Sequence, residues 1–434
     1  MSPATAGIVG ILVLILLFLI EFPVAFAMAF VGILGFGYLV SFSAGLEMLA
    51  MDIFENFSSY TLTVVPMFVF MGCIAFRIGM SDRLFDASYA FLGKLRGGLA
   101  VASIMACAGF AAICGSTNAT AAAMGTVALP QMKRYNYDDS LATGCVASAG
   151  SLGILIPPSA LLIVYGIITE ESIGKLFIAG ILPGLLLAFL FIIAVKILCA
   201  RNPALGPAGP ATSIKQKLGA LLAVGEVLIL FLLVLGGLFA GWFSPTQAGG
   251  AGAAGVLILG FIRRRVTWKG FVEAGKDTLL ITCMVMFIVT GAMIFSHFIA
   301  VTKIPFLLSD WVSALPIPPM AIMGLIVLLH LIGGCFMDGF ALIVLTVPIL
   351  LPMVKALGFD PIWFGIMIVL IVEMGTITPP VGINVYVIKG VAQDIPLETI
   401  FKGIFPFLAA LIAAAIILMV FPQIATFLPS FASY

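Results

Sequence analysis

Two stretches of the chain carry residue types that suit ligand binding at membrane depth. Residues 153–158 read Gly-Ile-Leu-Ile-Pro-Pro, and residues 375–380, which begin 222 residues later, read Gly-Thr-Ile-Thr-Pro-Pro. Each proline pair should interrupt a helix, because proline removes helix hydrogen bonds that lipid cannot replace. Paired interruptions at matching places in two halves of a chain indicate the binding site of a transporter, since broken helices expose backbone groups there.

A polar, glycine-rich tip precedes each interruption by about 40 residues. Residues 98–132 form two apolar arms around Gly-Ser-Thr-Asn at 115–118, and residues 319–354 do the same around 333–339, which include Asp338. Each arm has about 14–17 residues, or ~21–26 Å of helix, less than a hydrocarbon core of ~30 Å. The arms therefore predict two re-entrant hairpins, with two tilted membrane spans each as the alternative.

The composition requires a membrane protein. Of 434 residues, 63% are hydrophobic and only 9% are charged, whereas a soluble domain carries about 25% charged residues. The net charge of +1 gives no reason to expect nucleic acid. We expect an all-α polytopic protein whose first helix is retained, because it lacks the features of a signal peptide. Membrane spans are predicted at 5–21, 24–42, 61–78, 139–168, 173–199, 218–240, 245–262, 277–300, 360–390 and 397–428.

The duplicated motif divides the chain into two repeats joined by a polar, proline-rich linker. The predicted parts, in chain order, are a first repeat over 1–200 with the hairpin 98–132 and a broken helix over 139–168, a cytoplasmic linker over 201–217, and a second repeat over 218–434 with the hairpin 319–354 and a broken helix over 360–390.

The placement of basic residues predicts that the two repeats have opposite orientations. Basic residues gather on the cytoplasmic side of membrane proteins, and both ends of the first hairpin are basic (Lys94, Lys133). With the N-terminus outside, only Lys175, Lys303 and Lys355 of the 20 basic residues fall outside. The first hairpin then opens to the cytoplasm and the second to the periplasm, so the repeats are inverted.

In order and spacing these motifs resemble the large membrane subunit of a tripartite ATP-independent periplasmic (TRAP) transporter. The resemblance rests on residues 115–125, 153–159, 337–352 and 375–382 and covers essentially the whole chain. It implies a scaffold, an elevator-type transport domain that holds both hairpins, and sodium-coupled uptake of an organic acid across the bacterial inner membrane. It also implies two partners: a periplasmic substrate-binding protein, and a small four-helix membrane subunit on a separate chain.

The resemblance further implies that each hairpin tip and the facing helix break form one sodium site, with oxygen ligands from side chains and unwound backbone. The candidates for the first site are Gly115, Ser116, Asn118, Ser148, Gly150, Gly153 and Pro157. The candidates for the second site are Gly334, Asp338, Gly339, Gly375, Thr376, Thr378 and Pro379. Half-helix N-termini suit a carboxylate substrate, and the side chains predicted to lie near it are Thr120, Ser159 and Asn384.

Each candidate also has a purely structural explanation. Ser116 and Asp338 could cap the second arm of their hairpins, as residues of these types often do. Glu373, beside the second break, could lie near the site or be the buried partner of a hydroxyl group. An acidic side chain at membrane depth is costly and usually functional, which favours ligation by Asp338.

Other residues give weaker signals. The seven cysteines and the two histidines, His297 and His330, have no metal-ligand spacing and are interpreted as packing residues. The basic stretch 263–276, with Trp268, is predicted to lie along the cytoplasmic membrane surface. An intramembrane enzyme would need a catalytic constellation that the sequence lacks. The main alternative function is a stand-alone sodium/dicarboxylate symporter that needs no binding protein.

Overall fold

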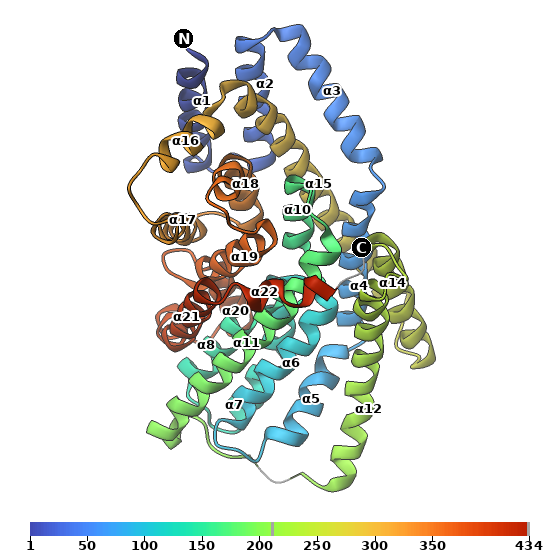
Figure 1. Ribbon diagram of the computed structural model, residues 1–434. Coiled ribbons are helices and arrows are strands. Elements are labelled where there is room, and N and C mark those ends of the chain that lie inside the picture. The colour runs from blue at the N-terminus through green and yellow to red at the C-terminus, as the bar shows by residue number, and fades with distance from the viewer. Residues whose placement is uncertain (210–211, 432–434) are drawn as a thin grey trace.

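The structure is a computed structural model that describes residues 1–209 and 212–431, and this part of the chain contains helices but no β-strand (Figure 1). Residues 210–211, in the predicted linker, and 432–434, at the end of the predicted second repeat, lie outside the described residues. Seven helices of the described part are long and apolar enough to cross a membrane, or eight if a bent pair counts as one span. The predicted all-α, multi-pass membrane protein is confirmed.

The helices of the first half, in chain order, are α1 (Pro3–Leu19), α2 (Val24–Leu39), α3 (Phe42–Ser58), α4 (Val64–Arg77), α5 (Met80–Leu92), α6 (Gly98–Cys114), α7 (Thr117–Arg134), α8 (Asp139–Ala149), α9 (Leu152–Leu155), α10 (Ala160–Thr169) and α11 (Ile173–Arg201). Those that follow are α12 (Ile214–Phe231), α13 (Gly237–Phe239), α14 (Pro245–Ile262), α15 (Trp268–Thr302), α16 (Ile304–Ser313), α17 (Pro319–Gly334), α18 (Gly339–Ala356), α19 (Pro361–Ile377), α20 (Ile383–Val391), α21 (Leu397–Val420) and α22 (Gln423–Thr426).

The predicted spans left out α3 and α5. Both helices carry charged residues within their length, such as Asp52 in α3 and Asp86 in α5, and these residues interrupt the apolar runs by which a span is recognised. The stretch 263–276, predicted to lie along the membrane surface, enters a helix. From Trp268 onward it forms the first turns of α15, a single helix of 35 residues.

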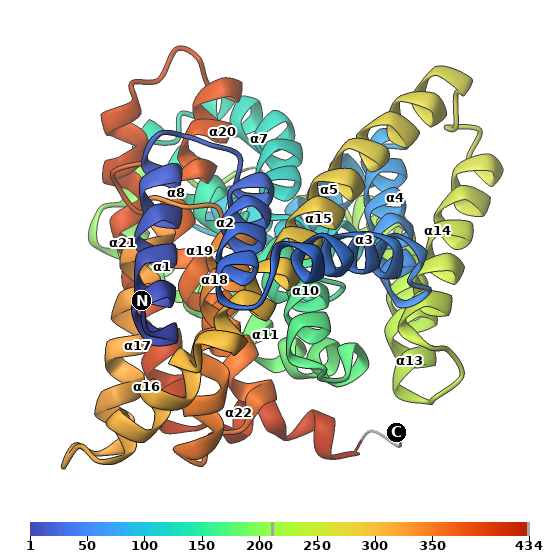
Figure 2. The same ribbon diagram turned by 90° about the horizontal axis from the view of Figure 1, so that it is seen from above.

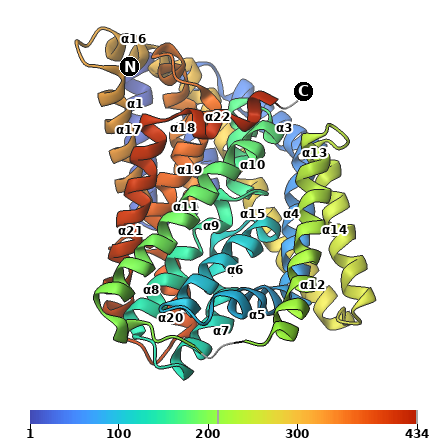
Figure 3. The same cartoon turned by 60° about the horizontal axis from the view of Figure 1, so that its bottom comes forward.

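Helix α19, which leads into the second break, lies in the middle of the molecule. In three views α14 lies on one side and α1, α16 and α17 lie on the other (Figure 1, Figure 2 and Figure 3). Between them, every residue of α19 from Trp363 to Ile377 is buried. A helix that is apolar all round belongs inside the protein, so α19 forms the centre against which α17, α18 and α21 pack.

Both proline pairs lie where a helix is broken. The first break covers residues 156–159, between the short α9 and α10, and the second covers 378–382, between α19 and α20. The Pro157–Pro158 and Pro379–Pro380 peptide bonds are both cis. The four helices on either side of these breaks therefore end or begin inside the molecule, with backbone groups that no helix continues to pair.

Two helical hairpins supply the polar tips. Helices α6 and α7 pack on each other and are joined at Gly115 and Ser116, while α17 and α18 are joined by residues 335–338. Gly115 has a φ of +66°, in the left-handed region that glycine adopts without strain. The arms have 17, 18, 16 and 18 residues, so each is at most about 27 Å long.

Candidate functional site

The two hairpin tips and the helices that flank both breaks meet around one small cavity of about 50 Å³. Small-molecule pockets usually have about 300–1,000 Å³, so this cavity has room for an ion or water but not for a molecule of several carbon atoms. Its walls come from both halves of the chain: Ser116, Thr117, Asn118, Ile154, Leu161, Asp338, Gly339, Phe340, Glu373, Thr376 and Ile383.

The backbone of the first tip lies in close contact with the backbone at the first break. A Cβ atom on Gly153 would lie 2.6 Å from both the Ser116 carbonyl oxygen and Thr120 Oγ1. A Cβ atom on Gly115 would lie 2.6 Å from the carbonyl oxygen of Pro158, and the Ala160 N–H donates to the Gly115 carbonyl (3.4 Å). Only glycine fits at these two positions, and the predicted candidates Gly115, Ser116 and Gly153 are brought together.

The other candidates for the first site have different surroundings. Gly150 packs on the first hairpin, since a Cβ there would lie 2.7 Å from the Ala121 Cβ. Asn118 is exposed and lines the cavity. Pro157 is buried, and its ring lies near Gly180 of α11, whose added Cβ would be 3.5 Å from Pro157 Cδ.

The second tip and break are equally close to each other. A Cβ atom on Gly375 would lie 2.3 Å from the carbonyl carbon of Gly334, and one on Gly339 would lie 2.7 Å from Val372 Cγ1. Of the two threonines here, Thr376 donates to the Glu373 carbonyl (2.9 Å) and Thr378 donates to the Met374 carbonyl (2.5 Å). Pro379 is exposed. The predicted glycines form the contact, while both hydroxyl groups bind the helix that carries them.

The two tips each begin a helix with a capping residue. Ser116 Oγ accepts from the Ala119 N–H (3.4 Å) at the start of α7, and Asp338 Oδ2 accepts from the Phe340 N–H (3.0 Å) at the start of α18. The capping explanation is therefore correct for both residues. Since both also line the cavity, the N-termini of α7 and α18, with their positive dipole ends, lie beside it.

A contact across the two halves connects the first tip to the second broken helix. The Thr117 hydroxyl donates to Glu373 Oε1 (2.9 Å), although the two residues are 256 positions apart. The Thr376 hydroxyl lies 3.4 Å from Glu373 Oε2, and Glu373 is completely buried. Glu373 therefore has both of the predicted positions: it lines the cavity, and it is the buried partner of a hydroxyl group. Thr117 was not among the predicted ligands, because no pattern in the sequence indicates this pairing.

Among the buried oxygen atoms that have no hydrogen-bond partner in the described part of the chain, three belong to predicted site residues: Thr120 Oγ1, Ser148 Oγ and Asn384 Oδ1. They belong to α7, α8 and α20, which contact one another, and the Asn384 amide donates to the Ala147 carbonyl (3.3 Å). The Thr120 hydroxyl also lies beside the Cys114 thiol. Buried polar atoms are nearly always paired, so neutral oxygens left in this way fit a small cation.

The three residues predicted to lie near the substrate are not brought together at the cavity. Ser159 is buried and caps α10, where its hydroxyl accepts from the Leu162 N–H (3.2 Å). Thr120 and Asn384 lie with Ser148 behind the first tip, on the helices just described. The cavity lining contains none of the three.

Comparison with known proteins decides which family has this arrangement. The model of the DctM component of tripartite ATP-independent periplasmic transporters matches residues 11–424. The chain belongs to this family. It is a large membrane subunit of a TRAP transporter, and its relatives are permease components rather than enzymes.

Individual relatives of this TRAP subunit match along most of their length. The C4-dicarboxylate TRAP transporter large permease protein DctM of Pseudomonas aeruginosa is 38% identical over 387 residues, covering 88% of this chain and 89% of the relative. The sialic acid TRAP transporter large permease protein SiaM of Vibrio cholerae is 33% identical over 408 residues, covering 94% of each. Among solved structures, the YdaH transporter of Alcanivorax borkumensis has a TM-score of 0.61 at 16% identity, over 87% of this chain and 89% of that one. That similarity shows the fold alone.

Proposed function

We propose that this TRAP subunit couples sodium entry to the uptake of an organic acid across the bacterial inner membrane. The observation that carries the proposal is that both tips and the helices flanking both breaks meet at one cavity, which gathers helix ends and polar side chains from the two halves. The relatives described above are named for C4-dicarboxylates and sialic acid, and both substrate classes carry carboxylates.

Two groups of oxygen atoms are the proposed sodium ligands. The first group joins the tip candidates Gly115, Ser116 and Asn118 to the unpartnered oxygens of Ser148, Thr120 and Asn384. The second group comprises Asp338, Thr376 and Glu373, which line the cavity, with the carbonyls exposed at the break 378–382. Hydroxyl, amide and backbone oxygens at unwound helix ends are the groups by which transporters of this kind coordinate sodium.

The substrate carboxylate is proposed to bind between the N-termini of α7 and α18, which favour a negative charge. In the described conformation the cavity of about 50 Å³ is too small for it, so the tips must separate when substrate enters. We propose that the two hairpins and two broken helices move together as an elevator against a scaffold that includes α2, α4, α14 and α15. The inverted orientation of the repeats, inferred from charge, gives each hairpin access to one side.

Two partners complete the proposed transporter. A periplasmic binding protein delivers the substrate, and a small four-helix membrane subunit packs on the scaffold. Sodium supplies the energy: each positive charge that moves inward across 100 mV contributes about 2.3 kcal/mol.

Uptake into vesicles tests the proposal. The chain is reconstituted with the small subunit and the binding protein, and labelled acid is supplied with a sodium gradient, with a potassium gradient, or without the binding protein. We expect uptake only with all components and inward sodium. Equal uptake in potassium would refute sodium coupling. Uptake by this chain alone would show a stand-alone symporter instead.

A further inference from the structure

Another cavity, of about 790 Å³, lies where the α4–α5 turn meets the α14–α15 loop and the side of α7. We call it the basic cavity. Its walls include Gly79 and Ser81 from the turn, Arg264, Arg265 and Lys269 from the loop region, and Thr126 from α7. Helices α14 and α15 are both candidate membrane spans, so the loop between them lies at a membrane surface.

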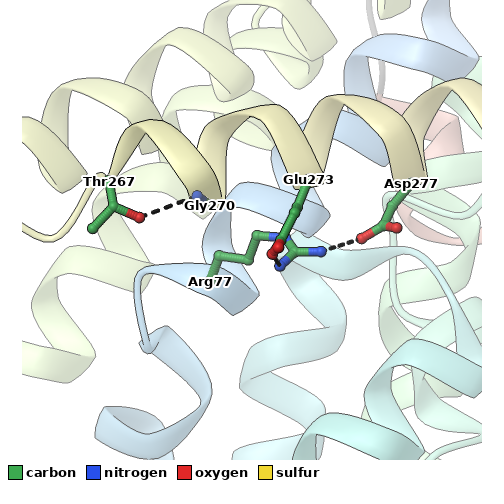
Figure 4. Close-up of polar contacts among 5 residues, drawn as sticks. All are labelled: Arg77, Thr267, Gly270, Glu273 and Asp277. Carbon is green, nitrogen blue, oxygen red and sulfur yellow. Dashed lines mark hydrogen bonds and ion pairs between the residues drawn. The ribbon is translucent and has the colours of Figure 1, made fainter.

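The basic residues around this cavity fall into two groups. Arg77, which also lines it, donates to Glu273 Oε2 (2.6 Å) and to Asp277 on α15, and Figure 4 shows its guanidinium between the two carboxylates. Arg83 and Arg263 both pair with Glu226. The second group has no ion-pair partner within the described part of the chain. It consists of Arg264, Arg265 and Lys269, which lie in the sequence between the paired residues Arg263 and Glu273. Their charges are available to a ligand.

The α4–α5 turn adds a helix N-terminus to these charges. Helix α5 has 13 residues and begins after Gly79, whose φ is +75°. Ser81, in its first turn, is only 1% exposed, and its hydroxyl lacks any hydrogen-bond partner in the described residues. Asp82, also in the first turn, is the one cavity carboxylate without an ion-pair partner in the described residues. Three free cations therefore face one free carboxylate, beside an unsatisfied hydroxyl and a positive helix end, which together suit an anion with several acceptor oxygens.

The surroundings of the basic cavity indicate which kind of anion would suit it. Trp268 at the start of α15 is 79% exposed, and Phe261 and Ile262 at the end of α14 are 63% and 71% exposed. An indole and large apolar side chains next to unpaired basic residues, at the end of two spans, are typical of the membrane interface. Basic pockets between membrane helices on the cytoplasmic side, where the charge pattern predicts this loop to lie, bind acidic lipid head groups.

We propose that the basic cavity binds the phosphate head group of an anionic phospholipid. The phosphate oxygens accept from the Ser81 hydroxyl and the side chains of Arg264, Arg265 and Lys269, while the acyl chains lie along Trp268 and Ile262. Because Thr126 of α7 forms part of the wall, the bound lipid contacts both the α14–α15 loop and the first hairpin.

Native mass spectrometry of the full chain in detergent tests this proposal. Phosphatidylglycerol and phosphatidylcholine are added in turn to the natural protein, to R264Q/R265Q, and to the control K94Q/R96Q, which removes two exposed charges outside the cavity. We expect one tightly bound phosphatidylglycerol per chain, a loss of at least about tenfold in affinity in R264Q/R265Q, and no change in the control.

A third variant tests the role of the buried hydroxyl. Ser81→Ala changes no charge, and we expect it to weaken phosphatidylglycerol binding by about tenfold, the contribution of a hydrogen bond to a charged group. Equal losses in R264Q/R265Q and K94Q/R96Q would overturn the proposal, as would equal binding of phosphatidylcholine. Displacement of the lipid by inorganic phosphate alone would show a site for free phosphate and would also overturn it.

Discussion

The two tip-and-break regions share a motif but differ in chemistry. The first region, residues 115–120 with 148–159, has neutral polar side chains, and the buried hydroxyl groups of Thr120 and Ser148 have no hydrogen-bond partner among the described residues. The second region, residues 334–339 with 373–384, has the acidic side chains of Asp338 and Glu373. Its threonine hydroxyls, Thr376 and Thr378, bind carbonyl oxygens of their own helix.

Because of this difference, the two regions should differ in the free-energy cost of having no bound ion. An unpaired hydroxyl in an apolar interior costs about 1–3 kcal/mol, whereas an unpaired charge costs much more. If the proposed sodium ion binds in the first region, its loss leaves only neutral groups unpaired there. If the proposed sodium ion binds in the second region, its loss leaves two acidic side chains without a counter-ion at membrane depth, so we expect this region to determine the dependence on sodium. The predictions below test this contrast, from the largest expected effect to the smallest.

The largest effect is expected from Gly375→Ala. The new Cβ would lie 2.3 Å from a backbone carbon of Gly334, and backbone cannot rotate away, so the second tip must shift from its break. We expect a loss of about 3 kcal/mol in the free energy of unfolding and no uptake. The control is Gly324→Ala in α17, which has nothing within 4 Å of the added Cβ. Thermal unfolding in detergent measures both, and equal midpoints would contradict the close contact.

Asp338→Ala is expected to have the next largest effect. It removes one of the two carboxyl groups of the second region, the one at the hairpin tip, so uptake should lose most of its sodium dependence while the protein still inserts. Asp360 provides the control, because it caps α19 through the Ile362 N–H (2.7 Å) but does not line the cavity. Asp360→Ala should cost about 1 kcal/mol of stability as a lost cap and leave sodium activation unchanged. Unchanged sodium activation in Asp338→Ala would remove this residue from the site.

The bond between Thr117 and Glu373 should give an intermediate effect. A double-mutant cycle with Thr117→Val and Glu373→Leu isolates it, because leucine has no acceptor, and we expect a coupling of about 1–3 kcal/mol in the free energy of unfolding, as for hydrogen bonds to charged groups. Thr143→Val is the control for Thr117→Val, because the Thr143 hydroxyl binds only the Asp139 carbonyl of its own helix (2.6 Å). A coupling near zero would mean that the two halves are not linked here.

Ser148→Ala should change stability least. Its hydroxyl is unpartnered, so its removal should leave the unfolding midpoint unchanged or raise it slightly, while the concentration of sodium for half-maximal uptake increases severalfold. Ser103, also buried, donates to the Leu99 carbonyl (2.8 Å), and Ser103→Ala should instead lose about 1 kcal/mol with no effect on sodium. The reverse pattern would show that Ser148 serves packing alone.

Much of the candidate site was predictable from the sequence. Proline and glycine act on the backbone within a few residues, so the breaks at Pro157 and Pro379 and the turn at Gly115 follow from local patterns. Hydropathy predicted most of the spans. It did not indicate the helices α3 and α5, because both carry charged residues that interrupt their apolar runs.

The sequence by itself determined the class of the protein, its two hairpins, its two broken helices and, through the order of these motifs, its family. Only the tertiary structure decided which polar atoms meet. It paired Thr117 with Glu373, placed the Gly334 backbone against Gly375, and left Ser148 without a partner. The reason is physical: interruptions of a helix are local events, whereas contacts between distant segments depend on how whole helix surfaces pack, and no short pattern encodes that.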